Sequence, residues 1–105
     1  MRILLVCGVG ASTGFIAKSM RKAAKERKVD AEIKAASKTE LMDYVEDIDI
    51  LLIGPHYKLE EETLKKKVEP YGVKATIIDS DYYAMIDGDG ILSQALELWE
   101  SKGEK

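Results

Sequence analysis

The sequence predicts an α/β protein with a single three-layer domain, in which a four-stranded parallel sheet carries helices on both faces. Two apolar runs, Ile3–Val6 and Asp49–Ile53, have the composition of central strands that are buried on both sides. Helical patterns separate the strands, and the connections are short. This alternation predicts right-handed β-α-β units and therefore a parallel sheet.

The other predicted elements follow the same alternation along the chain. The segment 31–36 alternates weakly between apolar and polar residues, which places it nearer an edge than the first strand. Ser37 or Thr39 is expected to cap a short helix after this strand. Gly54-Pro55 ends the third strand, because proline has no N–H group to donate to a neighbouring strand. In order, we expect a strand at 3–6, helix at 12–28, strand at 31–36, short helix from 37, strand at 49–53, helix at 59–69, strand at 74–78, polar and aromatic loop at 79–83, turn at 87–90 and a last helix that frays at 101–105.

The stretch after the first strand has the composition of an anion site. Cys7 ends the strand, and a loop of small residues separates it from the first helix. Loop N–H groups and the helix N-terminus attract anions, and a thiol beside a helix N-terminus ionises readily. The alternative is that Cys7 is an inert core residue and that the glycines only permit a tight turn. We predict that Cys7 is a nucleophile that accepts a phosphoryl group. The loop residues are Gly8, Val9, Gly10, Ala11, Ser12, Thr13 and Gly14.

Composition limits the class of protein. The 105 residues form one domain (1–105), and the net charge of -3 argues against a nucleic-acid-binding protein. A single cysteine cannot form an internal disulfide, so a reducing, cytoplasmic setting fits best. The apolar runs are too short for a membrane span or a secretion signal. The basic outer face of the first helix is either solvated or docks an acidic partner.

Three kinds of chemistry fit the loop. Gly8-Val9-Gly10 begins a dinucleotide-binding pattern, but Thr13 stands where glycine or alanine is needed and no acidic residue follows the second strand. We expect a phosphatase-like phosphate loop after the first strand, because cysteine-dependent phosphatases hold their substrate in a loop of this kind. Such an enzyme would have an arginine at the position of Thr13 to clamp the phosphoryl group. Without that clamp hydrolysis is slow, which suits a carrier that must keep its thiophosphate.

The carrier interpretation agrees with a family resemblance. VCGVGASTG, DILLIGP and IIDSDYYAMIDGDG resemble, in the same order, the lactose/cellobiose-type IIB component of the bacterial sugar phosphotransferase system. The resemblance implies a phosphocysteine at Cys7, held by backbone amides from about Gly8 to Gly14, and no metal or other cofactor. It also implies a phosphohistidine donor on a IIA protein. The acceptor would be a sugar presented by a IIC membrane permease, such as cellobiose, chitobiose or lactose.

The loops around Cys7 are then the expected docking surface for both partners. His56, the only histidine, could itself carry a phosphoryl group. It lacks a glycine-rich cradle, and the family's carrier is the cysteine, so we place His56 on the rim. Tyrosine favours interfaces but also packs in cores, so the tyrosines have two interpretations. The predicted partner contacts are His56, Tyr57, Ser80, Asp81, Tyr82 and Tyr83.

Overall fold

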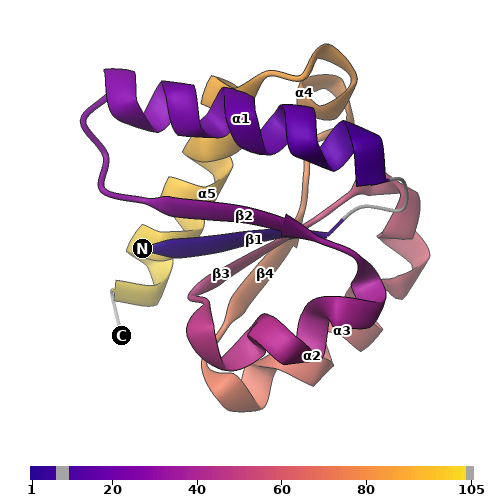
Figure 1. Cartoon of the computed structure of the whole chain (residues 1–105). Helices are drawn as coiled ribbons and strands as arrows, with labels where there is room; N and C mark the ends of the chain where they lie inside the picture. Colours follow the sequence, from indigo (N-terminus) through magenta and orange to yellow (C-terminus); the bar gives the residue numbers. More distant parts are fainter. Residues whose placement is uncertain (7–9, 104–105) are drawn as a thin grey trace.

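The chain folds as a parallel sheet with the strand order β2-β1-β3-β4 (Figure 1). A computed structural model describes the backbone of residues 1–6 and 10–103 and the side chains of residues 1–6 and 14–100. The strands are β1 (Arg2–Val6), β2 (Glu32–Ala36), β3 (Ile50–Ile53) and β4 (Lys74–Ile77). The α-helices are α1 (Gly10–Glu26), α2 (Leu41–Tyr44), α3 (Glu61–Val68), α4 (Ser80–Met85) and α5 (Gly88–Gly103). Four 3₁₀ turns complete the described elements, η1 (Lys38–Glu40), η2 (Val45–Asp47), η3 (Pro55–Glu60) and η4 (Glu69–Tyr71).

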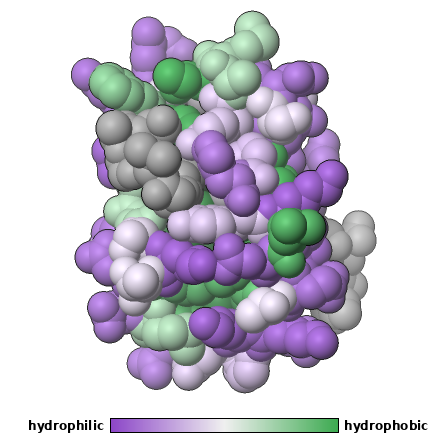
Figure 2. All heavy atoms as spheres, turned by 90° about the vertical axis from the view of Figure 1, so that its right-hand side faces the viewer, coloured by the Kyte–Doolittle hydropathy of each residue, from purple (hydrophilic) through white to green (hydrophobic). Residues whose placement is uncertain are grey.

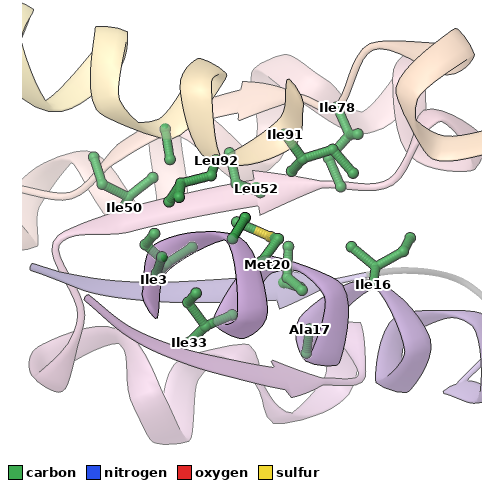
Figure 3. Packing of buried hydrophobic residues seen from close by; sticks show 14 residues of the cluster. Ile3, Ile16, Ala17, Met20, Ile33, Ile50, Leu52, Ile78, Ile91 and Leu92 are labelled. Atoms are coloured by element: carbon green, nitrogen blue, oxygen red, sulfur yellow. The ribbon is translucent and has the colours of Figure 1, made fainter. Parts of the chain in front are cut away.

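The two central strands divide their side chains between two apolar layers. Alternate residues of a strand point to opposite faces, so Ile3 and Leu5 lie in the cluster under α1 and α5, whereas Leu4 and Val6 lie in the cluster under α2 and α3. Figure 3 shows the first cluster, with Met20 of α1 pointing toward the sheet. The predicted three-layer parallel fold is confirmed, and β2 lies at an edge as expected.

The first helix begins earlier and ends sooner than the predicted range 12–28. It starts at Gly10, so part of the predicted loop 8–14 is helical instead. At the other end Lys28 adopts a left-handed φ of 58°, and the Val29 N–H donates to the Ala24 carbonyl over 2.8 Å. This Schellman arrangement ends the helix.

The segment 79–83, predicted to be a loop, contains the start of α4, so that prediction is wrong. Asp79 supplies the reason, because its side chain accepts hydrogen bonds from the backbone N–H groups of Asp81 at 2.9 Å and Tyr82 at 3.4 Å. The predicted turn at 87–90 is also wrong, since α5 already begins at Gly88. The chain turns instead at Ile86, whose φ is 52°.

A close crossing of α1 and α5 requires α5 to begin at Gly88. A Cβ atom added at Gly88 would lie 2.4 Å from the Ser19 carbonyl carbon and 2.4 Å from its Oγ. Ser19 Oγ accepts a hydrogen bond from the Gly88 N–H (3.1 Å) and donates one to the Ile86 carbonyl (3.2 Å). Glycine at this position lets α5 approach the α1 backbone, and Ser19 fixes the contact.

Candidate functional site at the carboxyl edge of the sheet

The carboxyl ends of β1 and β3 form the topological switch point of the sheet. The chain leaves β1 through α1 to reach β2 on one side, whereas β3 and β4 extend the sheet on the other side. Ligands of open α/β sheets bind at such a crevice. The two strand ends are joined here by a 2.8 Å hydrogen bond from the buried Gly54 N–H to the Val6 carbonyl.

The N-terminus of α1 faces this switch point. The helix begins at Gly10, four residues after the last residue of β1, and runs for 17 residues (Figure 1). A helix of this length presents its unpaired N–H groups and partial positive charge at its first turn. The predicted nucleophile and loop residues Cys7, Gly8 and Val9 lie outside the described residues, as do the side chains of Ala11, Ser12 and Thr13.

Gly14 lies in the second turn of α1 and not in a loop. It is exposed, and a Cβ atom added there would meet nothing within 4 Å. The alternative interpretation, in which the glycines only permit a tight turn, therefore does not apply to Gly14.

The loop after β2 forms one wall of the edge. Ser37 caps η1, and its backbone N–H donates to the Glu40 carboxylate over 3.0 Å. This hydrogen bond, followed by that of the Ser37 hydroxyl, lowers the pKa of Glu40 below its ordinary value of 4.5. The sequence left Ser37 and Thr39 as alternative caps, and the structure has Ser37 in this role.

Lys38 joins the loop after β2 to the loop after β3. Its Nζ atom donates to the Glu60 carboxylate over 2.5 Å and lies 4.7 Å from the centre of the Tyr57 ring. The hydrogen bond to Glu60 raises the pKa of Lys38 above its ordinary value of 10.5, although partial desolvation opposes this change. Tyr57, predicted as a partner contact, is half-buried beneath this ammonium group. Sequence reasoning missed the contact, because Lys38 and Glu60 lie 22 residues apart and no local pattern links them.

His56 and Tyr83 come together on the other side of the switch point. Their ring centres are 5.3 Å apart and the rings meet edge to face at 78°. This contact links the loop after β3 to α4, which follows β4. His56 is exposed as predicted for the rim, whereas Tyr82 and Tyr83 are half-buried and pack against the cluster under α1 and α5. Packing is thus one part of the role of both tyrosines.

Ser80 and Asp81 are exposed in the first turn of α4. The turn is held by Asp79, whose backbone N–H donates in turn to the Gln94 side chain of α5 over 2.9 Å. The structure therefore brings His56 and Tyr83 together, sets Tyr57 beside Lys38 and leaves Ser80 and Asp81 open to solvent.

Two further properties concern the described part of the chain. Residues 1–6 and 10–103 contain no group of three or more His, Cys, Asp or Glu side chains arranged to hold a metal ion. Within the same residues every helix is too short or too polar to span a lipid bilayer.

Comparison with known proteins gives one consistent result. Residues 2–94 match the family model described as PTS system, Lactose/Cellobiose specific IIB subunit. The oligo-beta-mannoside-specific EIIB component of Bacillus subtilis (strain 168) is 32% identical over 97 residues, covering 92% of this chain and 94% of that protein. The solution structure of the cellobiose-specific IIB component from Borrelia burgdorferi superimposes with a TM-score of 0.79 at 31% identity, covering 97% of this chain and 94% of that one.

A longer relative contains the same region. The lactose-specific EIICB component of Lacticaseibacillus casei is 27% identical over 99 residues, and the match covers 94% of this chain but 17% of that protein.

Proposed function

Because the chain belongs to the lactose/cellobiose-specific IIB subunits of the sugar phosphotransferase system, we propose that Cys7 is the residue on which it carries the phosphoryl group. The protein is a IIB component and thus a sugar phosphotransferase component of this system. One observation supports the role of Cys7. Cys7 directly follows Val6, which ends β1 at the switch point, and α1 begins at Gly10 with a first turn whose N–H groups have no acceptor within the helix.

The proposed reaction has two transfers. The Cys7 thiolate attacks the phosphorus of a phosphohistidine, so an S–P bond forms and the N–P bond breaks, and the histidine nitrogen leaves with the electron pair and takes up a proton. A sugar hydroxyl then attacks the same phosphorus, loses its proton and releases the thiolate. Backbone N–H groups at the start of α1 stabilise the equatorial oxygens by position and electrostatics.

The proposed donor is a IIA protein, and the acceptor is a sugar held by a IIC permease. The name EIICB of the Lacticaseibacillus casei relative supports the IIC partner, since that protein carries the IIB region within a longer chain. The named sugars of the relatives, an oligo-β-mannoside, cellobiose and lactose, support a β-linked sugar as the acceptor. A IIB domain that meets both partners would work in the cytoplasm, at the inner face of the membrane.

The test is transfer of labelled phosphate from a phosphorylated IIA protein, with mass spectrometry to locate the adduct. We expect the label on Cys7, and we expect Cys7→Ser to lose it while keeping the circular dichroism spectrum of the native protein. His56→Gln is the matched control and should still carry the label on Cys7, whatever its rate of transfer, because His56 is a predicted partner contact and not the predicted carrier. Label that survives in Cys7→Ser and disappears in His56→Gln would assign the carrier to the histidine instead.

Two further measurements separate the carrier from the alternatives that the sequence left open. A carrier without an arginine clamp should turn over p-nitrophenyl phosphate slowly, and brisk hydrolysis that thiol alkylation blocks would indicate a phosphatase. A dinucleotide-binding protein would show amide shifts on titration with nicotinamide or flavin cofactors, and we expect none.

A further inference from the structure

The sheet has two edges, β2 and β4, and the chain covers them differently. At β2 the Arg21 guanidinium of α1 donates two hydrogen bonds to the Ile33 carbonyl, at 2.6 Å and 3.0 Å. At β4 the Gln94 side chain of α5 donates to the Ile77 carbonyl over 3.3 Å, at the end of the strand and not at its centre. An uncovered strand edge is a template for pairing with another chain. The centre of β4 therefore offers such a template.

The backbone groups of Ala75, in the middle of β4, point away from the sheet. The N–H groups of Lys74 and Ile78 donate to the carbonyls of residues 49 and 53, at 3.1 Å and 2.8 Å, so the even-numbered residues of this segment face β3. Successive residues of a strand turn their N–H and C=O groups to opposite sides. Ala75 and Ile77 therefore turn theirs to the outer side, where the described part of the chain has no further strand. The hydrogen bond from Gln94 reaches the Ile77 carbonyl on this outer side.

One antiparallel register pairs β4 with β4 of a second copy. With a twofold axis at Ala75, the Ala75 N–H and C=O groups of the two copies bond to each other, and the Ile77 N–H meets the Val73 carbonyl. The same register sets the Val73 N–H opposite the Ile77 carbonyl. Both of these groups already have partners within the chain, the Val68 carbonyl at 3.4 Å and the Gln94 side chain at 3.3 Å. The pairing thus uses the free groups of the edge and leaves the satisfied ones in place.

The side chains beside β4 are complementary in this register as well. Ala75 and Ile77 pack toward the cluster under α2 and α3, so Lys74 and Thr76 lie on the α5 side of the strand. Lys74 then lies opposite Thr76 of the second copy, and Thr76 shares an open groove of about 210 Å³ with Glu97. Lys74 lines a further open groove of about 480 Å³. The twofold axis therefore brings a lysine to a glutamate twice.

The charges around the two grooves allow this contact. Neither Lys74 nor Glu97 forms an ion pair with a residue of the described part of the chain. Lys65 and Glu69 also line the Lys74 groove, but the Lys65 ammonium is held by Glu61 over 2.8 Å. Glu69 follows α3, which covers the opposite face of the sheet from α5. On the α5 side the facing charges are thus opposite in sign, which favours pairing of two copies.

We propose that β4 pairs with β4 of a second copy of this chain, so that two four-stranded sheets join into one continuous sheet. The switch point stays open in each copy, because β3 and β4 lie between the new strand and β1. Figure 2 looks onto the carboxyl ends of the strands, and the mostly hydrophilic face that it shows lies at right angles to the β4 edge. The inference does not depend on the role proposed for Cys7.

The first test is sedimentation velocity of the full chain at increasing protein concentration. We expect the wild type to shift from monomer to dimer. Ala75→Pro removes the N–H group at the twofold axis but none of the bonds to β3, so it should raise the dissociation constant about tenfold or more. Ala35→Pro is the matched control, because Ala35 is exposed at an outer position of the other edge strand, and it should dimerise like the wild type. Circular dichroism shows whether both variants are folded.

A charge exchange gives a second test that does not require Ala75→Pro to fold. Lys74→Glu and Glu97→Lys each place like charges across the axis and should each weaken the dimer, whereas the chain with both substitutions should regain it. A wild-type chain that stays monomeric at every concentration would overturn the inference. So would a dimer that persists in Ala75→Pro or is lost in Ala35→Pro, or a doubly substituted chain that dimerises no better than the single variants.

Discussion

The crossing of α1 and α5 at Gly88 gives a sharp test of the packing. In Gly88→Ala the new Cβ atom would lie 2.4 Å from two atoms of Ser19 and 2.6 Å from the Met20 nitrogen. Restoring a van der Waals distance of about 3.5 Å requires the helices to separate by about 1 Å. Two of these three atoms belong to the backbone, so rotation of a side chain cannot relieve the contact.

The cost has two sources. Overpacking of this kind costs about 1–3 kcal/mol. Separation also weakens the two hydrogen bonds of Ser19 Oγ, to the Gly88 N–H and the Ile86 carbonyl, which contribute about 1 kcal/mol each. We therefore expect the free energy of unfolding to fall by about 2–4 kcal/mol, which lowers the Tm by roughly 10–25 °C for a domain of this size.

Urea unfolding, followed by circular dichroism and by the fluorescence of the single tryptophan, Trp99, measures this change. The slope m should stay constant, because the substitution does not alter the surface exposed on unfolding. Gly14→Ala is the matched control, since nothing lies within 4 Å of its new Cβ atom. It should stabilise α1 by about 0.4–1 kcal/mol. A Gly88→Ala protein within about 0.5 kcal/mol of the wild type would refute the reasoning.

Two further predictions concern helix ends. Lys28→Gly should raise the free energy of unfolding by about 1 kcal/mol, because Lys28 is exposed and holds a left-handed φ of 58° that glycine adopts without strain. Urea unfolding measures this change, and a loss of stability would contradict the prediction. Glu40 should titrate below 4.5 in an NMR pH titration, since hydrogen bonds from Ser37 favour its carboxylate. Its lowered pKa means that its contribution to stability is present above pH 4.5 and is lost as the pH falls through the folded-state pKa. Glu40→Gln should therefore be less stable than the wild type at pH 7 and equal to it in acid, and an equal deficit at both pH values would exclude the cap as the cause.

The sequence by itself determined the layers of the fold. The apolar runs of β1 and β3 predicted strands that are buried on both faces of a sheet. The alternation of strands with helices predicted that the strands are parallel. The position of Cys7 at the end of the first predicted strand followed from the same pattern. The sequence also limited the cap of the next helix to Ser37 or Thr39, because capping signals are local, and the structure has Ser37 at that position. The family resemblance was carried by three short motifs in the same order and is confirmed by the match over residues 2–94.

Only the tertiary structure decided how the loops at the carboxyl edge meet. The Lys38–Glu60 hydrogen bond and the His56–Tyr83 ring contact join segments that follow different strands, so no periodicity along the chain could reveal them. The start of α5 at Gly88 depends on Ser19, which lies 69 residues away. Local patterns record how a segment buries its own apolar side chains, whereas such contacts depend on where other segments finally lie.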